Sequence, residues 1–89
     1  IQNRLWKMSQ RSKIRKLDLH GVFHSQVFDM VDPFIGECLI DNVSSFEIIT
    51  GYSKRMKEIV QDVLSDYNLK GVEPPFNSGT LIIKTWKEK

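Results

Sequence analysis

The sequence predicts an α/β domain in which two helices pack against a mainly parallel sheet that a final hairpin makes mixed. Strand-like and helix-like segments alternate in the order β-α-β-α and are followed by a weak strand, a turn and a last strand. Helices between strands favour crossover connections, which place successive strands parallel to one another. With 89 residues, the chain is long enough for one domain with one core.

The first strand is predicted over residues 14–20, where polar and apolar residues alternate. Asp18 and His20 lie two positions apart in this strand and therefore face the same way. Gly21 interrupts the alternation. The pattern thus predicts a strand that ends with an acid and an imidazole on one face and is followed by a turn.

An amphipathic helix is predicted from Ser25 onwards, because apolar residues recur there at intervals of three and four. The stripe consists of Val27, Val31, Phe34 and Cys38. Pro33 lies inside this segment, where a proline costs about 3 kcal/mol and one hydrogen bond. We therefore expect a kink at Pro33, or a restart of the helix with Asp32 as its N-cap.

The second half of the chain repeats the strand-and-helix pattern. Residues 46–50 form a β-branched and aromatic run that predicts a buried strand, and Gly51 ends it. A second helix begins at Lys54, since the apolar residues after it fit a period of 3.6. Two prolines restrict residues 72–76 to an edge strand or a loop. Residues 80–86 then form the last strand.

Composition excludes several classes of function. No apolar run approaches the roughly eighteen residues that span a membrane, and no secretory signal is visible at the N-terminus. The single cysteine, Cys38, excludes an internal disulfide framework and lies in the helical stripe, as a core residue would. The sequence contains no cysteine–histidine metal cluster, P-loop or nucleophile elbow. We expect a cytoplasmic protein.

Positive charge is concentrated at the N-terminal end. Six cations and no acids precede Leu17, whereas the rest of the chain carries seven cations and eleven acids. The six are Arg4, Lys7, Arg11, Lys13, Arg15 and Lys16. A basic arm over residues 1–13, joined to a domain over 14–89, is typical of a protein that binds phosphates. The alternative is a solvated terminal extension.

The two predicted strand ends should open onto the same edge of the sheet, where open α/β sheets bind ligands. At the second, Gly51 permits a tight turn and Ser53 is a suitable N-cap. Lys54 and Arg55 follow in the first helical turn, where the helix dipole disfavours each cation by about 0.3–1 kcal/mol. This placement predicts an anion held by backbone N–H groups, the Ser53 hydroxyl and the cations. The alternative is that both long side chains simply reach into solvent.

At the first strand end, Asp18 and His20 form a candidate acid–base pair. A carboxylate can orient an imidazole and favour its charged form, which suits a general acid or base near neutral pH. The alternative is that Asp18 caps a neighbouring backbone group and His20 has a structural role at the turn.

The Leu-Asp-Leu-His-Gly motif at residues 17–21 and the Thr-Gly turn at 50–51, each leading into a helix, resemble the small MutS-related (Smr) domain family over residues 14–86. The resemblance implies a two-layer βαβαββ sandwich with a mixed four-stranded sheet and two main helices, similar to the C-terminal domain of translation initiation factor three. It also implies nucleic-acid binding. By matching position, it assigns Asp18 and His20 to the active or binding site and Thr50 and Gly51 to the substrate-binding loop.

One position departs from the family pattern. Ser53 stands where the usual Thr-Gly-x-Gly loop has its second glycine, and the helix follows directly, as in the compact loops of phage-encoded members. The predicted function is a nucleic-acid-binding Smr domain that nicks DNA or cleaves RNA. The candidate residues are Asp18 and His20 for catalysis and Arg15, Lys16, Thr50, Gly51, Ser53, Lys54 and Arg55 for nucleic-acid binding.

Two mechanisms and two other functions remain open at this point. With RNA, His20 could deprotonate a 2′-hydroxyl without a metal, whereas DNA cleavage would need an activated water and a Mg²⁺ or Mn²⁺ ion near Asp18. The alternatives to an endonuclease are a non-catalytic nucleic-acid-binding module and a protein-interaction module. The oligomeric state is left undetermined.

Overall fold

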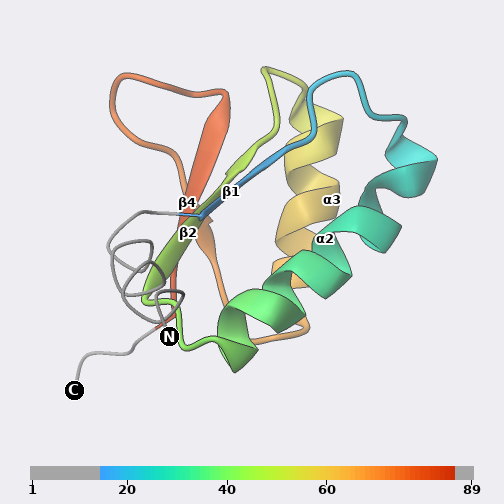
Figure 1. Ribbon diagram of the computed structural model, residues 1–89. Coiled ribbons are helices and arrows are strands. Elements are labelled where there is room, and N and C mark those ends of the chain that lie inside the picture. The colour runs from blue at the N-terminus through green and yellow to red at the C-terminus, as the bar shows by residue number, and fades with distance from the viewer. Residues whose placement is uncertain (1–14, 86–89) are drawn as a thin grey trace, which may run out of the picture.

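A computed structural model describes residues 15–85 of the chain. Two helices cover one face of a four-stranded sheet (Figure 1), so the predicted two-layer α/β class is confirmed. The elements are β1 (Arg15–Asp18), α2 (His24–Ile40), β2 (Ser45–Ile49), α3 (Lys54–Ser65), β3 (Gly71–Val72) and β4 (Thr80–Lys84). The predicted arm over residues 1–13 lies outside the described part. Within that part, no helix is both long and apolar enough to cross a membrane.

The sheet is mixed, as predicted, with the strand order β1-β2-β4-β3. The prediction that the sheet is mainly parallel is wrong, because β4 runs antiparallel to both β2 and β3 and parallel pairing is limited to β1 and β2. The hairpin from β3 therefore folds β4 back between β2 and β3. The two-residue β3 takes the edge, since the prolines that follow it cannot donate to a ladder. The longer β4, whose Leu81 and Ile83 are buried, takes a central position.

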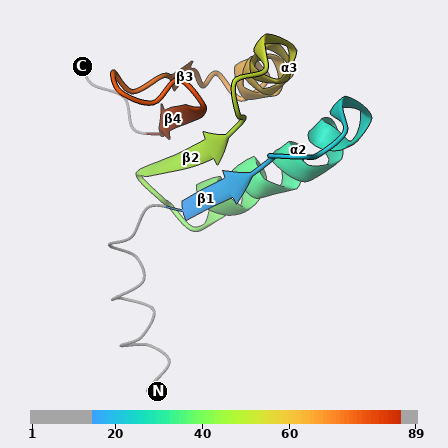
Figure 2. The ribbon, with the colours of Figure 1, turned by 90° about the horizontal axis from the view of Figure 1, so that it is seen from above.

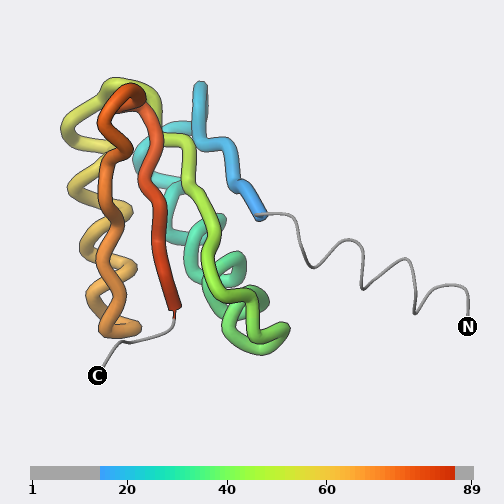
Figure 3. The backbone as a smooth tube through the Cα atoms, turned by 90° about the vertical axis from the view of Figure 1, so that its left-hand side faces the viewer, coloured from blue at the N-terminus to red at the C-terminus, as the bar shows by residue number. Residues whose placement is uncertain are grey.

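The hydrophobic core lies between the sheet and the two helices, which both pack on the same sheet face (Figure 2). The opposite sheet face, seen in Figure 3, is not covered by either helix. Phe46 anchors the core and meets Phe34 of α2 edge to face, with 5.4 Å between ring centroids. The buried helix residues are Val27, Val31, Ile35 and Cys38 from α2 and Met56, Val60, Val63 and Leu64 from α3.

The helix α2 continues through Pro33 as a single element. The predicted restart at Asp32 and Pro33 is therefore wrong. The lost hydrogen bond costs about 3 kcal/mol, whereas each buried aliphatic side chain in the stripe contributes about 1.5–3 kcal/mol. Because buried residues lie on both sides of Pro33, their packing against the sheet outweighs the cost of the proline.

Candidate nucleic-acid interface

Three loops meet at the end of the sheet where β1 and β2 finish and β4 begins. We call this end of the sheet the loop edge. Asp18 and Ile49 are register partners in the parallel pair β1 and β2, and the N–H of Leu19 extends the ladder by donating to the carbonyl of Ile49 at 2.8 Å. The loops after these strands, residues 20–23 and 50–53, therefore leave the sheet at the same end. The loop over residues 73–79 reaches this end as well, because Thr80 of β4 pairs with Ile49 (Figure 1).

Asp18 and His20 lie at this edge but are not joined through their side chains. The Asp18 Oδ1 atom accepts a hydrogen bond from the backbone N–H of His20 at 2.9 Å. This is the backbone cap that the sequence left as an alternative to an acid–base pair. The His20 side chain is exposed in the turn. Gly21 has a φ of 82° there, which explains why a glycine follows the histidine.

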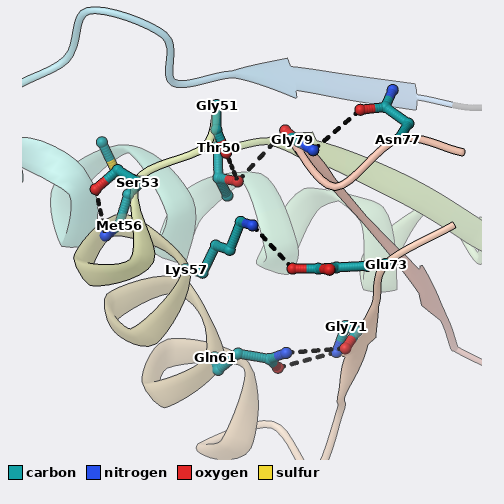
Figure 4. Close-up of polar contacts among 10 residues, drawn as sticks. All are labelled: Thr50, Gly51, Ser53, Met56, Lys57, Gln61, Gly71, Glu73, Asn77 and Gly79. Carbon is teal, nitrogen blue, oxygen red and sulfur yellow. Dashed lines mark hydrogen bonds and ion pairs between the residues drawn. The ribbon is translucent and has the colours of Figure 1, made fainter. Parts of the chain in front are cut away.

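Thr50 is buried and ties two of the loops together (Figure 4). Its side chain is 3% exposed, and its hydroxyl donates to the carbonyls of Gly51 at 2.8 Å and Gly79 at 3.3 Å. The carbonyl of Gly79 also accepts the backbone N–H groups of Thr50 at 2.9 Å and Gly51 at 3.0 Å. We call this arrangement the Gly79 latch. It turns the Thr50 hydroxyl into the protein rather than toward a ligand.

Sequence reasoning missed the latch and identified residues 77–79 only as a turn. Inside that turn, the Asn77 Oδ1 atom accepts the N–H of Gly79 at 3.0 Å. The Asn-Ser-Gly composition indicates such an Asx-type turn. Its pairing with residues 50–51, however, joins positions almost thirty residues apart, and no local pattern carries that information.

The start of α3 follows the prediction closely. Ser53 is the N-cap, and its Oγ atom accepts the N–H of Met56 at 3.1 Å (Figure 4). The N–H groups of Lys54 and Arg55, at the first two helical positions, have no acceptor within the helix. Both side chains are exposed, and the first turn contains no acid. Two backbone donors and two cations therefore lie together beside the loops.

Ion pairs occupy several cations near this site, and Arg55 is one of them. Lys57 pairs with Glu73 at 2.9 Å, and this contact connects α3 to the loop over residues 73–79 (Figure 4). Arg55 approaches Glu58 at 3.2 Å, in a pair whose side chains are both more than half exposed. Such an exposed pair contributes at most about 1 kcal/mol, so a phosphate can readily draw Arg55 away.

The structure does not bring Arg15 to this edge. Arg15 lies at the opposite end of β1, where its guanidinium contacts the Asp41 carboxylate at 2.8 Å. The hydrogen bond that the Arg15 guanidinium donates to the Asp41 carboxylate raises the pKa of Arg15. Lys16, the next residue, is exposed on the sheet face opposite the helices. Among residues 15–85 it makes no ion pair.

Metal ligands do not gather in the described part of the chain, where no group of three or more His, Cys, Asp or Glu side chains could hold an ion. Asp18 is the carboxylate beside His20 in the sequence. A Mg²⁺ ion is often bound by one or two carboxylates together with substrate phosphates and water. A metal at Asp18 would therefore take most of its ligands from the substrate and from water.

Comparisons with known proteins agree with this architecture. No curated protein matches the sequence. The solved structure of YdaL, a stand-alone small MutS-related protein from Escherichia coli, is similar in fold, with a TM-score of 0.62 and 23% sequence identity over 81% of this chain. This chain spans 64% of the length of YdaL. The Smr domain family model matches residues 17–74. The chain therefore belongs to the Smr domain family, whose members are nucleic-acid-binding, nuclease-type domains.

Proposed function

We propose that this Smr domain binds nucleic acid at the loop edge and cleaves the phosphodiester backbone there, as a DNA-nicking or RNA endonuclease. The observation that supports the proposal is the placement of an exposed histidine, His20, at the same edge as the cationic start of α3. A group that transfers protons and a group that holds phosphates are the two components that such a reaction needs.

Phosphate binding is assigned to the first turn of α3. The exposed N–H groups of Lys54 and Arg55 and the dipole of the helix favour an anion at this position. Without an anion, each of these cations is disfavoured there by about 0.3–1 kcal/mol. Lys16 and the basic arm over residues 1–13 add charge that attracts the backbone without reading its sequence. Lys57 is not included, because Glu73 neutralises it.

Cleavage is assigned to His20. On RNA, the neutral imidazole accepts the proton of a 2′-hydroxyl, and the 2′-oxygen attacks the adjacent phosphorus. The bond from phosphorus to the 5′-oxygen breaks, the leaving oxygen takes a proton from water, and the imidazolium gives its proton to the hydroxide so formed. The products are a 2′,3′-cyclic phosphate and a 5′-hydroxyl. On DNA the nucleophile is water, and a Mg²⁺ or Mn²⁺ ion held at Asp18 would supply the activation.

A second candidate function is a binding module without catalysis. It is favoured by the hydrogen bond between the Asp18 carboxylate and the backbone N–H of His20. This bond uses the carboxylate to shape the turn, so the imidazole lacks the orienting partner that is typical of catalytic histidines. The two candidates share the phosphate site and differ only at His20.

Labelled single-stranded and double-stranded RNA and DNA, incubated with the protein in Mg²⁺, Mn²⁺ or a chelator, separate these functions. The endonuclease proposal expects cleavage that His20→Ala abolishes while affinity is retained. Asp18→Asn keeps an acceptor for the His20 N–H but removes the charge. It should therefore preserve RNA cleavage in chelator and abolish any metal-dependent DNA cleavage. Cleavage that is unchanged in His20→Ala contradicts the catalytic assignment of His20. If no substrate is cleaved at all, the endonuclease proposal is wrong and the binding module without catalysis is supported.

The phosphate site is tested by the salt dependence of binding. A plot of log K against log salt has a negative slope, and each lost phosphate contact should reduce the magnitude of that slope by about 0.7–0.9. Lys54→Ala and Arg55→Ala should each do so. Lys70→Ala is a matched control. Lys70 is an exposed cation that precedes β3, at the end of the sheet opposite the loop edge. Equal slopes for all three variants and the wild type would place the phosphate site elsewhere.

A further inference from the structure

Exposed aromatic side chains surround the proposed site. Tyr52 is 80% exposed, Phe76 is 99% exposed and Phe23 is 74% exposed. Each of them belongs to a different one of the three loops at the edge of the sheet. Burying such a side chain would contribute about 1.5–3 kcal/mol, so the fold gains almost nothing from these rings where they are. Their shared location suggests a use in binding.

Phe76 is held out on a short, stiff turn. The N–H of Asn77 donates to the carbonyl of Pro74 at 3.2 Å, which closes a turn with Pro75 and Phe76 at its two central positions. Proline fixes the backbone at the first of these positions. The ring of Phe76 is therefore presented to solvent on a backbone that has little conformational freedom to lose when a ligand binds.

The loops that carry Tyr52 and Phe76 are fastened to each other. The Gly79 latch joins residues 50–51 to the end of the loop over 73–79 through three hydrogen bonds to one carbonyl. The ion pair between Lys57 and Glu73 joins α3 to the beginning of the same loop. The two loops that carry the aromatic rings are thus fixed to each other by the contacts drawn in Figure 4 and are not independent.

Charge next to these rings indicates the ligand. Tyr52 immediately precedes Ser53, Lys54 and Arg55, so a ring and a phosphate site are adjacent in the chain. Aromatic rings beside cations bind single-stranded nucleic acid, because every unpaired base offers a face for stacking while the backbone follows the positive charge. A paired base in a duplex has no free face to offer.

We propose that Tyr52 and Phe76 stack against unpaired bases, so that the domain selects single-stranded nucleic acid over duplex. This inference rests on the proposed nucleic-acid-binding function and adds the class of substrate. A strand would place its phosphates at the start of α3 and its bases on the two rings.

The test measures fluorescence anisotropy with the full chain and three labelled ligands: a single-stranded oligothymidylate, an abasic strand with the same number of phosphates, and a duplex. We expect the single strand to bind most tightly. Tyr52→Ala and Phe76→Ala should each weaken its binding about 5- to 150-fold, the range for one stacked base. Both variants should bind the abasic strand with the wild-type affinity. Tyr52→Phe should bind the single strand with the wild-type affinity.

Ile40→Ala serves as the matched control, since Ile40 is 80% exposed but lies at the far end of α2. It should bind all three ligands as the wild type does. Thermal melting of each variant establishes that it is folded. Tighter binding of the duplex, or full affinity of Tyr52→Ala and Phe76→Ala for the single strand, would overturn the stacking inference while leaving the proposed function intact. Failure of every ligand to bind would overturn both.

Discussion

The Gly79 latch predicts that Thr50 acts on stability rather than on binding, and Thr50→Val tests this. Valine keeps the shape of the side chain and removes its hydroxyl. The hydroxyl has one proton, shared between the carbonyls of Gly51 at 2.8 Å and Gly79 at 3.3 Å. The loss is therefore close to that of one hydrogen bond, about 0.5–1.5 kcal/mol. Two backbone N–H groups still bond to the Gly79 carbonyl in the variant.

Urea unfolding followed by circular dichroism measures this effect. We expect an unchanged slope and a lower midpoint, together with a fall in Tm of roughly 4–8 °C for a loss of about 1 kcal/mol in a domain of this size. Nucleic-acid affinity, measured well below the Tm, should be unchanged. Thr80→Val is the matched control. Thr80 is 5% exposed and, within residues 15–85, makes no side-chain hydrogen bond, so its replacement should not lower the midpoint.

The opposite pattern would refute the structural role of Thr50. The family resemblance implies that Thr50 belongs to a substrate-binding loop. If its hydroxyl contacted the ligand directly, Thr50→Val would weaken binding and leave the unfolding midpoint where it was. The two readouts move in opposite ways under the two hypotheses, which makes the variant decisive.

Two other predictions follow from close packing and from burial. Gly71→Ala should destabilise the domain by about 1–3 kcal/mol in urea unfolding, because the new Cβ would lie 3.0 Å from the Cβ of Leu81. Gly36→Ala, which meets nothing within 4 Å in α2, should instead stabilise it by roughly 0.4–1 kcal/mol; equal effects would contradict the packing argument. Burial raises the pKa of the Cys38 thiol. Since the folded state then holds its proton more tightly, stability should be constant below the ordinary thiol pKa and fall as the pH rises above it. Denaturation at several pH values should show this fall in the wild type and not in Cys38→Ala.

Features set by neighbouring residues were predictable from the sequence. The period of 3.6 placed α3, and the residue types at its start identified Ser53 as the cap and Gly51 as the turn. The structure confirms both, with a φ of 72° at Gly51. The order of these elements also predicted the fold class. For the helix, the cap and the turn, the cause lies within a few positions of the effect, so the sequence pattern is sufficient.

Features that depend on distant contacts were not predictable. The basic stretch predicted that Arg15 belongs to a phosphate site, but the fold places Asp41 beside it. Alternation placed Asp18 and His20 on one face, yet the strand ends at Asp18, and the carboxylate turns back to the backbone. The central position of β4 between β2 and β3 arises because β4 buries more apolar surface than β3. The amount that each strand buries is decided only when the whole sheet is assembled.

The serine at position 53 explains how a compact loop is compatible with the proposed phosphate site. Its backbone is extended, with a φ of −71°, so this position does not require glycine. The cap that its hydroxyl makes contributes about 0.5–2 kcal/mol and starts α3 immediately after the Gly51 turn. The N–H groups of Lys54 and Arg55, which have no acceptor within the helix, therefore lie next to the loop over residues 50–53. In the proposed function, binding depends on the start of α3 and cleavage depends on His20. Because these groups belong to different segments of the chain, the proposal implies that a change at His20 alone would remove cleavage while the start of α3 still holds nucleic acid.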